Sequence, residues 1–230
     1  MASREGEGFE SQRKRLVARL VAEGILQSPK VVKSMETVPR EKFLPPEMVI
    51  SSYVDTPLPI SSGQTISAPH MVAIMCEALE LAEGQKVLEV GAGSGYHAAV
   101  VAEIVAPVGS ENPGHIYSVE IHHTLTEFAR RNLEGAGYGH RVTVIEGDGS
   151  QGLPEEAPFD RISVTASAPS VPQPLIDQLK DGGILVIPVG DPHSFQELLL
   201  VKRGVNGRIN TRSICGVAFV PLTGKYGWRG

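Results

Sequence analysis

The stretch VLEVGAGSGY, residues 87–96, decides the fold. Its first half is an apolar run that predicts a buried strand, and its second half places Gly91, Gly93 and Gly95 at alternate positions. Glycine tolerates backbone conformations that other residues avoid, and it lets main-chain amides approach a ligand closely. The stretch therefore predicts a strand, a ligand-binding turn and the start of a helix.

The spacing of these glycines bears on the ligand. The dinucleotide pattern Gly-x-Gly-x-x-Gly has its third glycine where this chain has Tyr96. Glu89, at the end of the strand, is unfavourable beside a pyrophosphate and favourable beside a cation. S-adenosylmethionine, a nucleoside with a sulfonium and an ammonium group and no phosphates, matches both features. An ordinary glycine-rich turn stays open as the alternative, because short glycine motifs also arise by accident.

The composition predicts one soluble globular domain. The 230 residues are 41% hydrophobic and 20% charged, and their net charge of −5 gives no basic surface for a long nucleic acid. No apolar stretch has the length of a membrane span, and the charged start MASREGEGFESQRKR is unlike a secretory leader, so we expect a cytoplasmic protein. Cys76 and Cys215 are far apart and predict reduced thiols rather than a metal site.

The order of elements predicts an α/β fold: a doubly wound, mostly parallel, seven-stranded sheet with an N-terminal helical arm and a C-terminal antiparallel hairpin. Strands alternate with helices, which is typical of a buried parallel sheet. We expect a single domain over 1–230, with the arm and an active-site loop in 1–68 and the core in 69–230. The expected helices are 9–23, 29–37, 69–81, 96–106, 124–137 and 172–183, and the expected strands are 86–90, 115–120, 141–148, 159–166, 184–190, 194–203 and 209–222.

Ligands of such sheets bind beyond the carboxyl ends of the strands. Glu120 ends the second core strand, where its carboxylate could accept hydrogen bonds from two ribose hydroxyls. Asp148 follows the third strand and could accept one from an adenine amino group. Either acid alone is more often a solvated residue. A glycine loop and two acids at three successive strand ends favour the cofactor site of a class I methyltransferase, and a loop insertion at 107–115 accounts for the long spacing to Glu120.

The segment SGQTISAPHM, residues 62–71, precedes the first core strand and is the part of the sequence that is most informative about the substrate. Its hydroxyl groups and His70 lie between proline-rich sequence and an expected helix. Ser67 is also well placed to cap that helix, since Pro69 follows it at the first turn. Both interpretations of Ser67, active-site residue and helix cap, stay open here.

Taken together, the motifs resemble one family, the protein-L-isoaspartate O-methyltransferases. The resemblance runs in order from about residue 12 to the C-terminus, and TISAPHM is more specific than the glycine loop. The segments that carry it are VPREKFLPP at 38–46, GQTISAPHMVA at 63–73, VLEVGAGSGY at 87–96, EGDGSQG at 146–152, APFDRISVTASAP at 157–169, GGILVIPVG at 182–190 and VAFVPL at 217–222.

The resemblance implies S-adenosylmethionine as cofactor, with S-adenosylhomocysteine as its product, no metal, and isoaspartyl-containing proteins and peptides as substrates. It implies Ser67 as the active-site serine and Ser67, Ser167, Ala168 and Val220 as substrate contacts. The cofactor contacts, including Glu89 from the charge argument above, would be Thr65, Ile66, His70, Glu89, Gly91, Gly93, Glu120, Asp148, Gly149 and Thr223. The chain departs from the family pattern at two places, Ser167 in VTASAP and the insertion at 107–115. Neither removes a motif residue, so they concern only the shape of the substrate groove.

A substrate carboxylate is already ionised near neutral pH and needs no general base to attack a sulfonium methyl group. We therefore expect Ser67 to position the carboxylate, assisted by main-chain amides near Ser167 and Val220. We further expect a monomer that binds neither nucleic acid nor membranes. A methyltransferase for a small molecule or RNA and a catalytically silent binding domain stay open as alternatives.

Overall fold

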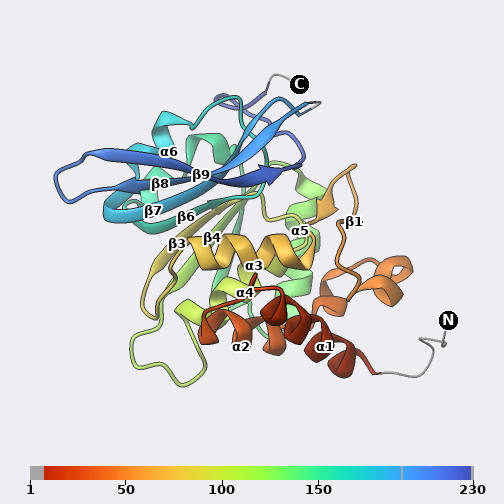
Figure 1. Ribbon diagram of the computed structural model, residues 1–230. Helices are drawn as coiled ribbons and strands as arrows, with labels where there is room; N and C mark the ends of the chain where they lie inside the picture. The colour runs from red at the N-terminus through yellow and green to blue at the C-terminus, as the bar shows by residue number, and fades with distance from the viewer. Residues whose placement is uncertain (1–7, 193, 229–230) are drawn as a thin grey trace.

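A seven-stranded sheet forms the centre of the computed structural model, which describes residues 8–192 and 194–228 (Figure 1). The strand order is β5-β4-β3-β6-β7-β8-β9. The pairs from β5 to β7 are parallel, whereas β8 is antiparallel to β7 and β9 is antiparallel to β8. The predicted doubly wound sheet with a C-terminal hairpin is therefore confirmed. The bounds are β3 Lys86–Val90, β4 His115–Glu120, β5 Val142–Glu146, β6 Phe159–Val164, β7 Leu179–Gly190, β8 Gln196–Arg203 and β9 Ile209–Val217.

The central strands β3 and β6 are buried on both faces. Successive side chains of a strand point to opposite sides, so neighbouring residues pack into different clusters. Val87 and Ile184 pack into one apolar cluster with the N-terminal helices, and their neighbours Leu88 and Leu185 pack into a second cluster with Leu175 of α6. The long helices and α6 accordingly lie on opposite sides of the sheet (Figure 1). The helices are α1 Phe9–Ala22, α2 Pro29–Thr37, α3 Pro69–Ala78, α4 Tyr96–Val105, α5 His123–Gly135 and α6 Gln173–Asp177.

The segment between α2 and α3 contains short elements that the sequence pattern did not predict. Two 3₁₀ helices, η1 Arg40–Phe43 and η2 Pro46–Ser51, are followed by a two-stranded ladder of β1, Leu58–Pro59, and β2, Thr65–Ile66. Leu58 pairs with Ile66 in this ladder, and both side chains are buried. The ladder therefore brings the TISAPHM segment back against the protein.

The predicted helix 172–183 is wrong in its second half. Helix α6 ends at Asp177, and Leu179 already belongs to β7, where it pairs with Phe159 of β6. The pairing shifts register between Phe159 and Arg161, and Gly182 lies in this region with φ of +79°. The two glycines at 182–183 resemble the end of a helix in the sequence. In the structure they lie within β7, next to the shift in register, and glycine is a residue that often marks such a bulge in a strand.

The carboxyl ends of β3, β4 and β5 share one edge of the sheet. The glycine loop follows β3, Glu120 ends β4, and Gly147 follows β5 with its amide bonded to the Glu120 carbonyl oxygen at 2.9 Å. Two further 3₁₀ helices, η3 Gly149–Gln151 and η4 Pro154–Glu156, lead to β6. Within 8–192 and 194–228, no helix is both long enough and apolar enough to cross a membrane.

Candidate active site

The glycine loop between β3 and α4 has a backbone conformation and a close packing that residues with side chains would not allow. Gly91 and Gly95 have φ of +95° and +86°, a region that glycine enters without strain. A Cβ on Gly95 would lie 2.9 Å from Leu133 Cγ of α5, and one on Gly91 would collide with Thr165 Oγ1. Glycine at these positions therefore permits both the turn and its close packing against the neighbouring strand and helix.

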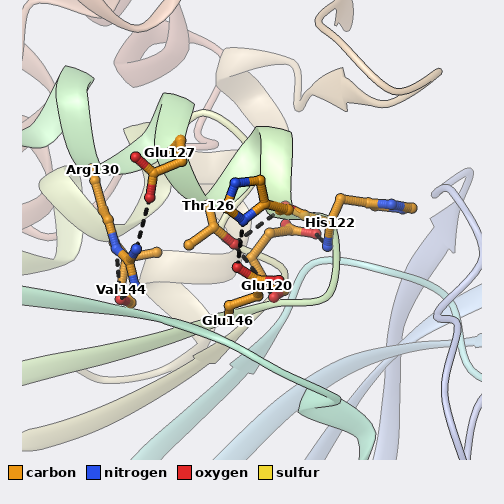
Figure 2. Close-up of polar contacts among 8 residues, drawn as sticks. Glu120, His122, Thr126, Glu127, Arg130, Val144 and Glu146 are labelled. Carbon is orange, nitrogen blue, oxygen red and sulfur yellow. Dashed lines mark hydrogen bonds and ion pairs between the residues drawn. The ribbon is translucent and has the colours of Figure 1, made fainter.

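Glu120 connects the end of β4 to this loop. Its Oε2 accepts a hydrogen bond from the Gly93 amide at 3.0 Å, and its Oε1 accepts one from the His122 amide at 3.0 Å. Figure 2 shows the latter contact beside the first turns of α5. The residue is 5% exposed, yet it lines a cavity. Each carboxylate oxygen can accept more than one hydrogen bond, so Glu120 retains capacity for a ligand.

That cavity, the glycine-loop cavity, has a volume of about 540 Å³. No lysine or arginine is among the described residues that line it, whereas a phosphate-binding site commonly uses one. Its lining residues are Gln64, Thr65, Val90, Gly91, Gly93, Val119, Glu120, Ile121, His122, Leu125, Gly149, Thr165, Ala166, Val220, Pro221, Leu222 and Thr223.

A second, larger cavity of about 1,050 Å³ adjoins the first, and we call it the Ser67 groove. Thr65 and Thr165 line both. Thr165 Oγ1 donates hydrogen bonds to the carbonyl oxygens of Gly91 at 2.7 Å and Val90 at 3.1 Å, which holds the shared wall against the glycine loop. The groove is lined by Pro57, Thr65, Ser67, Ala68, His70, Met71, Thr165, Phe195, Gly216, Val217, Ala218, Phe219 and Val220.

Ser67 does not cap α3. The N-cap position belongs to Ala68, and the Ser67 hydroxyl makes no hydrogen bond within the described residues. Ser67 is half-buried and lines the groove, and it also lines a smaller cavity together with Gly91, Gly93 and Ile66. The helix-cap interpretation is therefore wrong, and Ser67 lies where the groove and the small cavity beside the glycine loop meet.

Glu89 does not lie where the charge argument expected it. It is 1% exposed and does not line the glycine-loop cavity. Its Oε1 lies 2.8 Å from His97 Nδ1, and its Oε2 accepts a hydrogen bond from Ser118 Oγ. Burial opposes charge on the imidazole, but Cys76 and Glu89 outweigh it and raise the pKa of His97 to about 10. Glu89 is thus paired beneath the loop, and Glu120 is the carboxylate at the cavity wall.

Asp148, which was expected to contact an adenine amino group, does not line the glycine-loop cavity. Oδ1 accepts hydrogen bonds from the Ser150 amide at 3.0 Å and hydroxyl at 2.6 Å, and Oδ2 accepts from the Lys225 amide at 2.8 Å and from Gln151 Nε2 at 3.1 Å. Burial opposes the charge, but these bonds lower the pKa of Asp148. Asp148 binds the C-terminal segment, while its neighbour Gly149 and Thr223 of that segment line the cavity.

Of the predicted substrate contacts, only Ser67 and Val220 line the groove. Ser167 and Ala168 are fully buried. The Ser167 amide donates to the Val220 carbonyl oxygen at 2.8 Å, and its hydroxyl donates to Gly190 O at 2.9 Å. The Ser167 amide is therefore engaged within the protein, against the prediction that it assists the substrate, and it acts by holding Val220.

His70 lines the groove rather than the glycine-loop cavity. Sequence reasoning found Val220 but missed other residues that line the two cavities. Ile121, His122 and Leu125 directly follow Glu120, so their place after a ligand-binding strand end was a usable signal. Phe195, on the β7–β8 connection, had no such signal. Among residues 8–192 and 194–228, no three histidine, cysteine or acidic side chains gather as a metal site.

The cavity suits the adenosine part of S-adenosylmethionine. Glu120 offers a carboxylate to paired hydroxyls, and apolar side chains from β4, α5 and the C-terminal segment offer a slot for a flat ring. A Cβ on Gly149 would lie 2.6 Å from Val90 Cγ1, so the Gly149 backbone packs directly against the Val90 side chain at that wall.

Comparisons with known proteins agree with this geometry. The chain is 58% identical over 229 residues to a protein-L-isoaspartate O-methyltransferase of Hyperthermus butylicus, covering 99% of this chain and 95% of the relative. It is 53% identical over 221 residues to that of Staphylothermus marinus, covering 96% and 98%. A Plasmodium falciparum structure named for the same enzyme, in complex with S-adenosyl-L-homocysteine, superposes with a TM-score of 0.82 at 31% identity, covering 92% and 98%.

The family model for protein-L-isoaspartate(D-aspartate) O-methyltransferase matches residues 11–227, which include the glycine loop, Glu120 and Ser67. The chain therefore belongs to the protein-L-isoaspartate(D-aspartate) O-methyltransferase family.

Proposed function

We propose that this chain uses S-adenosylmethionine to methylate the α-carboxylate of L-isoaspartyl residues in damaged proteins and peptides, with Ser67 holding that carboxylate. The observation that carries the residue assignment is the position of Ser67. Its hydroxyl makes no hydrogen bond within the described residues, and it lines both the groove and the small cavity beside Gly91 and Gly93.

Bound S-adenosylmethionine supplies an electrophilic methyl group on sulfur. The substrate carboxylate is ionised near neutral pH, so the protein does not need to remove a proton. Ser67 donates a hydrogen bond to one carboxylate oxygen and leaves the other directed at the glycine loop. Such positioning, with exclusion of water, can contribute about 7–11 kcal/mol to catalysis.

Other residues hold the two reactants next to each other. Glu120 accepts hydrogen bonds from the ribose hydroxyls while it also fixes Gly93. Thr165 holds Gly91 at the wall between the glycine-loop cavity and the groove. Val220, kept in place by Ser167, lines both spaces. The main-chain amide nitrogen of the following residue then attacks the ester carbonyl and expels methanol, which gives a succinimide without further help from the protein. Hydrolysis returns part of the succinimide to normal aspartate.

The groove also accounts for selectivity. An isoaspartyl link lengthens the main chain by one methylene and leaves a free α-carboxylate beside it, whereas a normal aspartyl side chain presents its carboxylate in another position. A misplacement of about 1 Å can lower a rate on the order of a hundredfold. Residues on both walls, including Met71 and Phe219, shape the path of the peptide.

The test is methyl transfer from labelled S-adenosylmethionine to an isoaspartyl peptide and to its aspartyl twin, with a structured RNA and a set of small carboxylic acids as further acceptors. We expect transfer to the isoaspartyl peptide and almost none to the others. Comparable rates on both peptides, or transfer only to RNA or a small acid, would contradict the proposal. Binding of S-adenosylmethionine without any transfer would favour a silent domain.

We also propose that the chain acts in the cytoplasm as a monomer, without nucleic-acid or membrane partners. The net charge of −5 supports the absence of nucleic acid. The proposal includes a division at residue 68: the arm and active-site loop contribute Ser67 and two cavity residues, Gln64 and Thr65, and the core contributes the rest of the cofactor cavity. Light scattering of the purified chain tests the oligomeric state, and a stable dimer would contradict it.

A further inference from the structure

Helix α3 starts directly after Ser67, and its first turn obtains a cap from a distant part of the chain. Ala68 has no side chain that could accept a hydrogen bond, and the helix has no side-chain cap at its N-cap position. The main-chain amide of His70 donates instead to Asp55 Oδ1 at 2.9 Å, across 15 residues. The first amides of a helix lack acceptors within the helix, so Asp55 supplies one of them.

The same carboxylate makes two further contacts. Asp55 Oδ1 lies 2.9 Å from His70 Nδ1, and Asp55 Oδ2 accepts a hydrogen bond from Arg19 Nη2 of α1 at 2.8 Å. The side chain of Asp55 is 15% exposed, against 48% for Arg19. One carboxylate therefore joins the N-terminal helix, the start of α3 and a ring that lines the Ser67 groove.

The position of Asp55 in the chain makes this contact relevant to Ser67. Asp55 precedes β1, which pairs with β2 through Leu58 and Ile66. Ser67 follows β2 directly and lies three residues before His70, so the short segment that carries it is held by the ladder on one side and by the Asp55 cap on the other. The Ser67 hydroxyl has no hydrogen-bond partner of its own among the described residues, so its place depends on where this backbone segment is held and on the χ1 rotamer of the side chain.

We propose that Asp55 is a positioning residue for methyl transfer: its carboxylate fixes the start of α3 and the His70 ring, and through them the place of Ser67. The inference rests on the proposed role of Ser67. Loss of the cap lets the residues after β2 relax. Gln64 and Thr65 of the same segment line the glycine-loop cavity, but Thr65 is held by its pairing with Pro59 in the ladder, and Asp55 does not line that cavity. The effect of losing Asp55 therefore falls on the substrate and on methyl transfer, and not on the cofactor.

The test compares Asp55→Ala, Asp55→Asn and Asp55→Glu. Alanine removes the acceptor, asparagine keeps an acceptor for the His70 amide without the charge, and glutamate keeps the charge but lengthens the side chain by one methylene. We expect kcat to fall at least about tenfold in Asp55→Ala and Asp55→Glu, with a higher KM for the isoaspartyl peptide, because misplacement of about 1 Å suffices for such losses. Asp55→Asn recovers most of kcat, and affinity for S-adenosylhomocysteine stays within about twofold in all three.

Two controls separate positioning from general loss of stability. Arg19→Gln removes the ion pair but leaves the cap, so kcat stays close to wild type. Ser34→Ala removes a buried hydrogen bond to the Val100 carbonyl oxygen in the same arm, away from the site, and it lowers stability without changing KM. Melting temperatures of all variants are measured alongside the kinetics.

The inference is overturned if Asp55→Ala and Asp55→Glu retain the kcat and KM of the wild type, or if activity falls only as the folded fraction falls, as in Ser34→Ala. Asp55→Glu carries the test on its own if Asp55→Ala does not fold. Failure of the proposed function is seen separately: wild-type protein would then transfer no methyl group to the isoaspartyl peptide at all. A fully active Ser67→Ala beside a slow Asp55→Ala also overturns the inference, since Asp55 would then not act through Ser67.

Discussion

The Glu120 carboxylate accepts a hydrogen bond from the Gly93 amide at 3.0 Å, which ties the end of β4 to the glycine loop that follows β3. The two strands are neighbours in the sheet, so their carboxyl ends meet at the same edge. The contact leaves hydrogen-bonding capacity on both carboxylate oxygens, and Glu120 lines the glycine-loop cavity. Loop geometry and ligand recognition thus depend on the same side chain.

Glu120→Ala should weaken S-adenosylmethionine binding by about 1.5–3 kcal/mol, the range for hydrogen bonds to a charged group. Glu120→Gln should lose less, because its amide oxygen can still accept from Gly93. Calorimetric titration measures both, with circular dichroism to verify the fold. Unchanged affinity in a folded Glu120→Ala protein would remove Glu120 from the cofactor site.

Ser67→Ala and Ser67→Gly should both fold with stability within about 0.5 kcal/mol of the wild type, because Ser67 caps no helix and surface-facing changes are usually that small. Single-turnover methyl transfer should fall on the order of a hundredfold in both, since the carboxylate loses its positioning contact. Cofactor affinity should change little. A variant that is stable and as fast as the wild type contradicts the assignment of Ser67.

The His97–Glu89 pair predicts a dependence of stability on alkaline pH. Burial opposes the imidazolium, yet Cys76 and Glu89 raise the pKa of His97 to about 10, against about 6.5 in an unfolded chain. A raised pKa gives stability that is fully present below about pH 6.5 and is lost as the pH rises toward 10. The free energy of unfolding should therefore fall over this window, and more steeply in the wild type than in His97→Gln. Parallel curves for the two proteins would show that His97 is uncharged in the folded state.

Asp148 should couple acid stability to the C-terminal segment. Burial opposes its charge, but hydrogen bonds from Lys225 and Ser150 lower the pKa of Asp148, so its stabilisation is present above about pH 4 and is lost as the pH falls through the folded value. Asp148→Asn should reduce this acid dependence and speed hydrogen exchange at the Lys225 amide, which donates to Oδ2 at 2.8 Å. Cofactor binding should weaken with it, because Thr223 lines the cavity. Unchanged exchange at Lys225 would contradict this role.

The sequence by itself determined what depends on local chemistry. Continuous apolar strands that alternate with helices along the chain determined a buried parallel sheet. Glycines that adopt positive φ determined the turn after β3. The strand-end rule also indicated Glu120, because the carboxyl ends of parallel strands meet at one edge of the sheet and ligands bind there. The order of the motifs was sufficient to indicate the family.

Only the tertiary structure decided which of the acidic residues faces the cavity and what caps α3. Glu89 and Glu120 both lie near the carboxyl ends of neighbouring strands, but packing places Glu89 beneath the loop with His97 and leaves Glu120 at the wall of the cavity. Asp55 reaches the His70 amide across 15 residues, so no local pattern could reveal it, and Ser67 looked like the cap only because it lies next to the helix. Contacts between distant segments depend on how the whole chain packs, whereas turns and strands follow from a few adjacent residues.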